Sequence, residues 1–172
     1  MMTHTDSIKT NLQTVKARIA GAALRAGRSP DEVHLVAVSK TFPAQAILAA
    51  WAEGQRDFGE NRPEEGAAKI PEVEAMIQDA RPTWHMIGHI QRRKTNLVIE
   101  HFDFIHSLDR LVLAQKLSTL AMAAHKEIPV LLECNVSGEV SKYGYTASGW
   151  EHDAGVRNAF YREVSAVLAL PG

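Results

Sequence analysis

Short apolar runs rich in β-branched residues alternate with amphipathic patterns along nearly the whole chain, and this alternation restricts the fold more than any other feature. Successive strand and helix units predict parallel strands joined by right-handed crossovers. The first run is apolar at almost every position, which predicts a strand covered on both faces. The five predicted strands are VHLVAVSK at 33–40, RDFG at 56–59, TWHMIG at 83–88, FDFIHS at 102–107 and IPVLLECN at 128–135.

Before and between these strands, apolar residues recur at spacings of three and four, which predicts six helices. The first has a polar cap among residues 5–7 and ends near Gly27. We expect Pro71 to kink or split the third helix, because proline removes a backbone hydrogen bond, and we expect Asp109 to cap the fifth. The five later helices cover about 43–54, 63–79, 92–100, 109–120 and 150–168.

Two α/β architectures fit this order of elements. A five-stranded doubly wound sheet fits the length of 172 residues, whereas a (β/α)8 barrel takes about 250 residues and three more units. The sequence contains no low-complexity linker and no break in composition, so a single domain over 1–172 is expected. In both architectures functional groups gather at the carboxyl ends of the strands.

The composition argues against several classes of function. The net charge is -1, with 23% charged and 45% hydrophobic residues, so nothing in the overall balance favours nucleic acid or a membrane surface. The apolar runs are too short to span a membrane and the first residues are polar, so the cytoplasm is the expected location. His85 and His89 are four apart, but a strand and turn separate them, so no metal site is expected. The single cysteine, Cys134, is expected to be a small core residue.

Polar residues stand where the predicted strands end, and the first of them is a lysine. Lys40 follows the apolar run of the first strand directly. A lysine that is desolvated at such a place loses its preference for the charged form and becomes a nucleophile toward carbonyls, with a Schiff base as the product. The alternative is a lysine that merely extends from a strand end into water. The other polar strand ends are 59–61, 85–89, 106–107 and Asn135.

Five short motifs favour the interpretation of Lys40 as a nucleophile. They are AVSK at 37–40, FGEN at 58–61, WHMIGHIQRRK at 84–94, IHSLDR at 105–110 and NVSGEVSKYG at 135–144. In this order and spacing they resemble the pyridoxal 5'-phosphate (PLP) homeostasis proteins of the YggS or PROSC type. The resemblance implies the barrel fold of the alanine racemase N-terminal domain, with PLP held as a Schiff base on Lys40. It also implies that Asn61, His85 and Asn135 lie around the cofactor ring. Lys142 would either contact the ligand or position the loop in which it lies.

The implied function is PLP binding in intracellular PLP homeostasis, without catalytic turnover. The implied partners are PLP and PLP-dependent apoenzymes, with no nucleic acid and no membrane, and the expected state is a monomer or weak homodimer. The alternatives are a PLP-dependent racemase or decarboxylase-like enzyme, which would need a second domain, and an unrelated small-molecule-binding α/β domain.

The resemblance has a gap at the carboxyl-terminal end of the chain. The family's Ser-x-Gly-Met-Ser and Val-Arg-Ile-Gly segments, which hold the cofactor phosphate, do not occur in this sequence. We therefore expect a barrel that is truncated at its carboxyl-terminal end, with about five βα units. Two open sheet edges would favour association.

Overall fold

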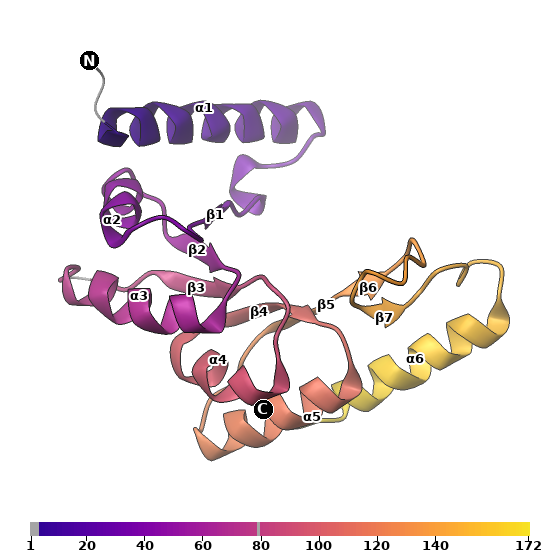
Figure 1. The fold of residues 1–172 in the computed structure, drawn as a ribbon. Coiled ribbons are helices and arrows are strands. Elements are labelled where there is room, and N and C mark those ends of the chain that lie inside the picture. Colours follow the sequence, from indigo (N-terminus) through magenta and orange to yellow (C-terminus); the bar gives the residue numbers. More distant parts are fainter. Residues whose placement is uncertain (1–3, 79) are drawn as a thin grey trace.

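The computed structural model describes residues 4–78 and 80–172, and its central feature is a parallel five-stranded sheet (Figure 1). Its strands are β1 (Val36–Val38), β2 (Asp57–Glu60), β3 (Thr83–Met86), β4 (Phe104–Leu108) and β5 (Val130–Leu132). The helices that alternate with them are α2 (Ala44–Ala52), α3 (Pro63–Ala75), α4 (Thr95–His101) and α5 (Leu111–Ala123). The five predicted strands and the βα alternation are thus confirmed.

The strand order distinguishes the two predicted architectures. The strands lie in the order β1-β2-β3-β4-β5, the same as in the chain, and every neighbouring pair is parallel. A doubly wound sheet reverses its order and places helices on both faces. Here the order never reverses, so α2 to α5 lie along the same side of the sheet (Figure 1). The doubly wound alternative is therefore wrong, and the arrangement is that of a barrel wall.

The core lies between the sheet and these helices. Side chains on the outer face of the strands pack against one side of each helix, and Trp84 is fully buried, as expected of a core aromatic. Its indole N–H donates to Oε1 of Glu74 over 3.1 Å. The largest buried apolar side chains are Ile47, Phe58, Ile70, Trp84, Met86, Ile90, Phe102, Ile105, Leu108 and Leu113.

The opposite face of the sheet is largely uncovered. Val38 in β1 is 50% exposed and Leu131 in β5 is 49% exposed. The expectation that the first strand is covered on both faces is wrong, because α2 to α5 all lie on the other side of the sheet (Figure 1).

The first helix is longer at its start than the sequence predicted. α1 spans His4–Arg25, so it begins before the expected cap among residues 5–7, and the side chains of residues 4–6 lie outside the described part. The helix ends close to Gly27, which has the positive φ of a helix-terminating glycine. The expected first helix is confirmed, and its cap is not.

Three other helix predictions need correction. α3 ends at Ala75, whereas its predicted end, residue 79, lies outside the described residues. Pro71 lies inside α3, and the helix continues past it to Ala75, so the expected split is absent. Asp109 does not cap α5, because the N-cap residue is Arg110 and the Asp109 carboxylate binds its guanidinium over 2.5 Å.

Beyond β5 the chain forms a second, smaller unit. β6 (Cys134–Asn135) and β7 (Tyr145–Thr146) pair in parallel, so the strand predicted for 128–135 is divided in two. α6 (Ala154–Leu168) follows, and the Asp153 side chain caps it by accepting from the backbone N–H groups of the first turn. Short 3-10 turns lie at Pro30–Glu32 and Arg92–Lys94. Among the helices of the described residues, none has the length and apolar character that a membrane span requires.

Candidate functional site

The polar residues at the strand ends gather on one rim of the sheet, because all five strands run in the same direction. Val38, Gly59 and His85 are aligned across β1, β2 and β3. Lys40 and Asn61 each follow two positions later, beyond the ends of β1 and β2, so both stand at the carboxyl-terminal rim. His85 lies one row below them, within the sheet. The structure thus brings three of the predicted site residues to one end of the barrel wall.

Lys40 lies in a tight turn directly after β1. Its side chain is exposed, and it has no hydrogen bond or ion pair with the residues that the structure describes. The expected desolvation is therefore absent, since the short strand ends before Lys40 and nothing covers its inner face. Thr41, the next residue, has a φ of 65°, which is rare for a β-branched side chain. The chain therefore turns sharply at the amine.

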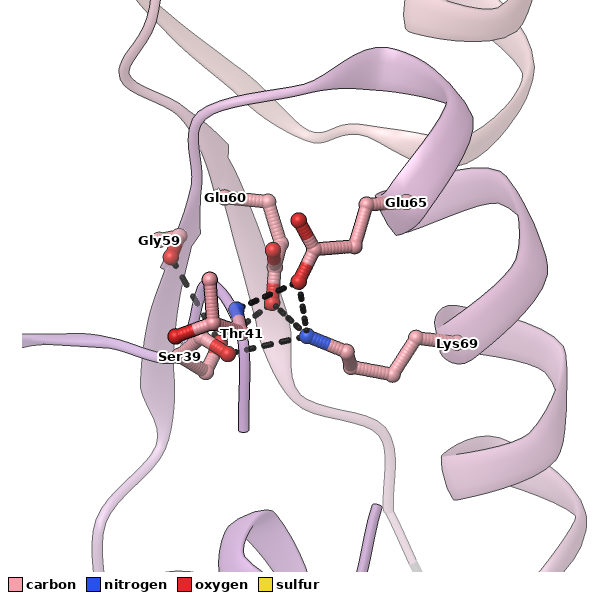
Figure 2. A network of polar contacts seen from close by, with 6 residues as sticks. All are labelled: Ser39, Thr41, Gly59, Glu60, Glu65 and Lys69. Carbon is pink, nitrogen blue, oxygen red and sulfur yellow. Dashed lines mark hydrogen bonds and ion pairs between the residues drawn. The ribbon is translucent and has the colours of Figure 1, made fainter. Parts of the chain in front are cut away.

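A buried network of charges supports this turn (Figure 2). The Lys69 ammonium of α3 donates to the backbone carbonyl of Ser39 over 2.9 Å, to Oε1 of Glu60 over 2.8 Å and to Oε1 of Glu65 over 2.9 Å. The Ser39 hydroxyl donates to the same Glu60 oxygen over 2.7 Å, and the Thr41 backbone N–H donates to Glu65 over 2.5 Å. The network therefore contacts the residues on both sides of Lys40.

Sequence reasoning missed this network, although two signals were present. Glu65 and Lys69 are four positions apart in a predicted helix, a spacing that brings opposite charges together. Glu60 stands directly after a predicted strand, where an acidic side chain needs a cationic partner if it is buried. The carboxylate of Glu60 is fully buried, so a cationic partner from elsewhere in the chain was required.

The electrostatics of Glu65 follow from its contacts. Burial acts to raise its pKa, but hydrogen bonds from Lys69 and from the Thr41 backbone N–H act in the opposite direction and together lower the pKa below its ordinary value of 4.5. Glu65 is therefore ionised at neutral pH, and its negative charge compensates the buried ammonium.

His85 is fixed through both of its ring nitrogens. Nε2 lies 3.0 Å from Oδ1 of Asp57, and Nδ1 lies 2.9 Å from Nε2 of His106. The ring also stacks on Phe104, with centroids 5.4 Å apart. An ionised Asp57 favours a proton on Nε2, which leaves Nδ1 to accept from a neutral His106. Burial, and then the neighbouring His85, lower the pKa of His106, which favours this neutral form.

Asn135 is engaged in shaping the loop that follows it. Its amide nitrogen donates to the backbone carbonyls of Glu139 and Lys142, over 3.0 and 3.4 Å, and its Oδ1 accepts from the backbone N–H of Gly138. These bonds hold the start of the loop and use most of the amide's capacity. Lys142 is exposed in the same loop. Asn135 therefore positions the loop of Lys142.

This loop contacts the rim near β3 through an aromatic pair. The rings of Tyr143 and His89 stack with centroids 3.7 Å apart. Nδ1 of His89 lies 3.1 Å from Oδ2 of Asp109, at an angle that does not make a hydrogen bond. The loops after β3 and β6 are thus packed together, although they are distant in sequence.

A polar hollow of about 670 Å³ lies beside the rim. Asn61 lines it, and the Asn61 side chain has no hydrogen-bond partner among the residues the structure describes. Lys94 lines it too, paired with Glu64 over 2.6 Å. The complete lining is Asn61, Arg62, Pro63, Glu64, Glu65, His89, Gln91 and Lys94. Lys40 and His85 do not line this hollow, so Asn61 is the one of these three predicted residues that faces it.

Comparison with known proteins identifies the family. The family model described as the alanine racemase N-terminal domain matches residues 3–158. A pyridoxal phosphate homeostasis protein of Pseudomonas aeruginosa is 48% identical over 138 residues, which cover 80% of this chain and 58% of that protein. The chain belongs to the alanine racemase N-terminal domain family, in its pyridoxal phosphate homeostasis branch.

Solved structures of this family agree with the fold. PipY of Synechococcus elongatus, solved with PLP bound, is 36% identical with a TM-score of 0.63, covering 86% of this chain and 64% of PipY. Alanine racemase of Bartonella henselae is 15% identical with a TM-score of 0.56, covering 98% of this chain and 50% of the racemase, which shows the shared fold alone. The chain spans 57 to 60% of the length of the curated homeostasis proteins it matches.

In this homeostasis-family chain, the predicted residues divide into two groups. Lys40, Asn61 and His85 lie on the rim and inner face of β1 to β3. Asn135 and Lys142 lie beyond β5, in and after β6, at the other end of the sheet from β1 (Figure 1).

Proposed function

We propose that this chain binds PLP reversibly through Lys40 and acts in PLP homeostasis. The observation that carries the proposal is the position of Lys40, a primary amine without an ion-pair partner among the described residues, on a hydrogen-bonded turn at the carboxyl end of β1. This donor set fits an aldehyde cofactor. The PLP bound to PipY, a relative with 36% identity, supports the same ligand class.

The proposed linkage follows ordinary carbonyl chemistry. Lys40 in its unprotonated form adds to the aldehyde carbon of the cofactor, and loss of one water molecule leaves a C=N bond, the Schiff base. The cofactor supplies the electrophilic carbonyl and the aromatic ring. Because the Lys40 side chain is exposed, water can reach the linkage and reverse it, which is what a carrier requires.

The other residues have smaller parts in the proposal. Asn61 offers a free amide to a polar group of the cofactor, and His85 offers an imidazole oriented by Asp57. Asn135 acts indirectly by holding the loop of Lys142. These residues are proposed to recognise the ring and the aldehyde of the cofactor.

We propose a carrier without catalytic turnover, meeting PLP-dependent apoenzymes in the cytoplasm as a monomer or weak dimer. An amino-acid racemase needs a second base opposite the lysine and a second domain that completes its site. The relatives are named homeostasis proteins, which supports a carrier over an enzyme. Exchange of the α-hydrogen of amino acids by the purified protein with PLP, lost in Lys40→Ala, would overturn this part of the proposal.

The decisive experiment is to mix the full chain with PLP, reduce with borohydride, and measure the intact mass and the modified peptide. We expect a single reduced adduct on Lys40 at near-stoichiometric PLP. Lys40→Arg keeps the positive charge but cannot form the imine, so the adduct should disappear. Lys142→Arg is the matched control in an exposed loop and should keep the adduct on Lys40. Adducts spread over surface lysines, or none, would contradict the proposal.

A further inference from the structure

Two peptide groups flank the α-carbon of Lys40, and both are hydrogen-bonded to the same buried network (Figure 2). The carbonyl of the Ser39–Lys40 peptide accepts from Lys69 over 2.9 Å, and the N–H of the Lys40–Thr41 peptide donates to Glu65 over 2.5 Å. Because the backbone rotates about the two bonds between these peptides, holding both of them fixes the direction of the Lys40 side chain at its root.

The Lys69 ammonium at the centre of the network is fully hydrogen-bonded and largely shielded from water. The Lys69 ammonium has three protons and three acceptors, and its side chain is 10% exposed. Glu60 is fully buried, and its Oε2 has no partner within the described residues, so its carboxylate accepts hydrogen bonds through Oε1. Ser39 adds a hydroxyl donor to that same oxygen. Such a cluster has one low-energy arrangement, because any rotation leaves a buried charge unpaired.

The conformation of Thr41 shows that the network imposes a shape on the turn. A β-branched residue at a φ of 65° is strained on its own. The hydrogen bond from its N–H to Glu65 compensates for that strain. The turn would otherwise relax toward an extended backbone, and the Lys40 side chain would then leave the rim in another direction.

We propose that Lys69, Glu60 and Glu65 are positioning residues that fix the direction in which Lys40 presents its amine. This inference rests on the proposed function, because it concerns how the same lysine meets an aldehyde. A buried ion pair is often no more stabilising than apolar residues of the same volume, and its best-attested use is to select one conformation. The three residues therefore act through Lys40 and need no contact with the cofactor.

The test compares Glu65→Ala with Glu65→Gln in the full chain. Alanine removes the acceptor of the Thr41 N–H, whereas glutamine keeps an oxygen there and loses only the charge. The rate of adduct formation on Lys40 with PLP is measured by absorbance and confirmed by borohydride reduction and peptide mapping. We expect a loss of about tenfold to a hundredfold for alanine, the scale that misplacement of a reacting group causes. Glutamine should restore most of the rate.

A core substitution far from the turn supplies the matched control. Leu117→Ala, in α5, removes a buried apolar side chain and lowers stability without touching the network. Its rate of adduct formation should equal that of the unmodified chain. Lys69→Met is the more severe variant and is expected to lose the rate at least as strongly. If it fails to fold, the Glu65 pair still decides the question, because Glu65 is 27% exposed and tolerates substitution better.

A second readout needs no cofactor. Hydrogen exchange of the Thr41 amide should be slow in the unmodified chain and fast in Glu65→Ala. In Leu117→Ala it should also be slow, after correction for the lower global stability of that variant. Equal adduct rates in Glu65→Ala and the unmodified chain, with Lys40 modified in both, would overturn the positioning role and leave the proposed function intact. Failure of the unmodified chain to form an adduct on Lys40 would overturn the proposed function and, with it, this inference.

Discussion

The hydroxyl of Tyr145 is a polar group in a buried environment. The side chain is 2% exposed, and its hydroxyl has no hydrogen-bond partner within the described residues. Burial, followed by the negative charge of Glu163, raises its pKa from 10.0 to about 12. An unpartnered buried hydroxyl costs about 1–3 kcal/mol, so the native chain carries this penalty at neutral pH.

The raised pKa of Tyr145 predicts a loss of stability in alkali. The folded state holds the phenolic proton more tightly than the unfolded state, so the stabilisation is fully present below pH 10 and is lost as the pH rises toward 12. Tyr145→Phe should reduce this loss and should be neutral or stabilising at pH 7. Urea unfolding at several pH values measures both effects.

The control for this prediction is Tyr161→Phe, which removes a hydroxyl from a residue that is 50% exposed. The alkaline loss should remain in this variant, because Tyr145 is still present. An equal alkaline loss in Tyr145→Phe and the unmodified chain would show that the Tyr145 hydroxyl is not responsible.

Among the helices, α3 has a close contact that predicts the effect of one methyl group. A Cβ at Gly66 would lie 2.4 Å from Cζ of the buried Phe102 ring. Gly66→Ala gains helix propensity, but the overpacking costs about 1–3 kcal/mol and should outweigh that gain. We therefore expect a net destabilisation in urea unfolding, with the transition shifted to lower denaturant.

Gly21→Ala in α1 is the matched control for Gly66. Its added Cβ meets the Arg25 guanidinium at 3.4 Å, the far end of a flexible side chain. The substitution should stabilise by about 0.5–1 kcal/mol, since alanine suits a helix better than glycine. If both variants are stabilised alike, the contact between α3 and Phe102 is looser than described.

The same elements show what the sequence could and could not predict. Apolar periodicity found all five strands of the sheet and all six helices, because each buries a stripe that repeats at 2 or 3.6 residues. It missed β7, whose two residues are too few to show a period. It also misassigned Asp109. A carboxylate before a helix can accept from the backbone N–H groups of the first turn or pair with a neighbouring guanidinium, and the sequence does not distinguish the two.

The site was predicted unevenly for a related reason. The position of Lys40 followed from a strand end and a motif, both of which are local. The support from Lys69 did not, because Glu60 lies on a strand and Lys69 on the next helix, and their contact depends on how the two pack. The exposure of Lys40 also escaped, since the apolar letters of the first run do not reveal that the strand ends at Val38, two residues before the amine.

At the scale of the whole molecule, the uncovered inner face of the sheet predicts self-association. Leu131 is 49% exposed on β5, one of the two outer strands. Exposed apolar surface next to an open strand edge favours pairing with a second copy. We expect the sedimentation coefficient of the chain to rise with concentration, and Leu131→Lys to suppress that rise, because a charge on an edge strand opposes pairing.

Met122→Lys provides the comparison for Leu131→Lys. Met122 is 51% exposed on α5, on the helical side of the molecule, so the same change there should leave self-association unaltered. A sedimentation coefficient independent of concentration in the unmodified chain would show that the inner face does not mediate contacts between copies.

The sequential strand order also bears on folding during synthesis. Ser39 and Lys69 are separated by 30 positions. The segment from Ser39 to Lys69 contains the turn, both glutamates and the lysine that binds them. Contacts of short sequence separation form early, and a growing chain folds from its amino-terminal end. The turn that carries Lys40 can therefore adopt its conformation on the ribosome, while the loop of Lys142 at the far end of the sheet is still to be made.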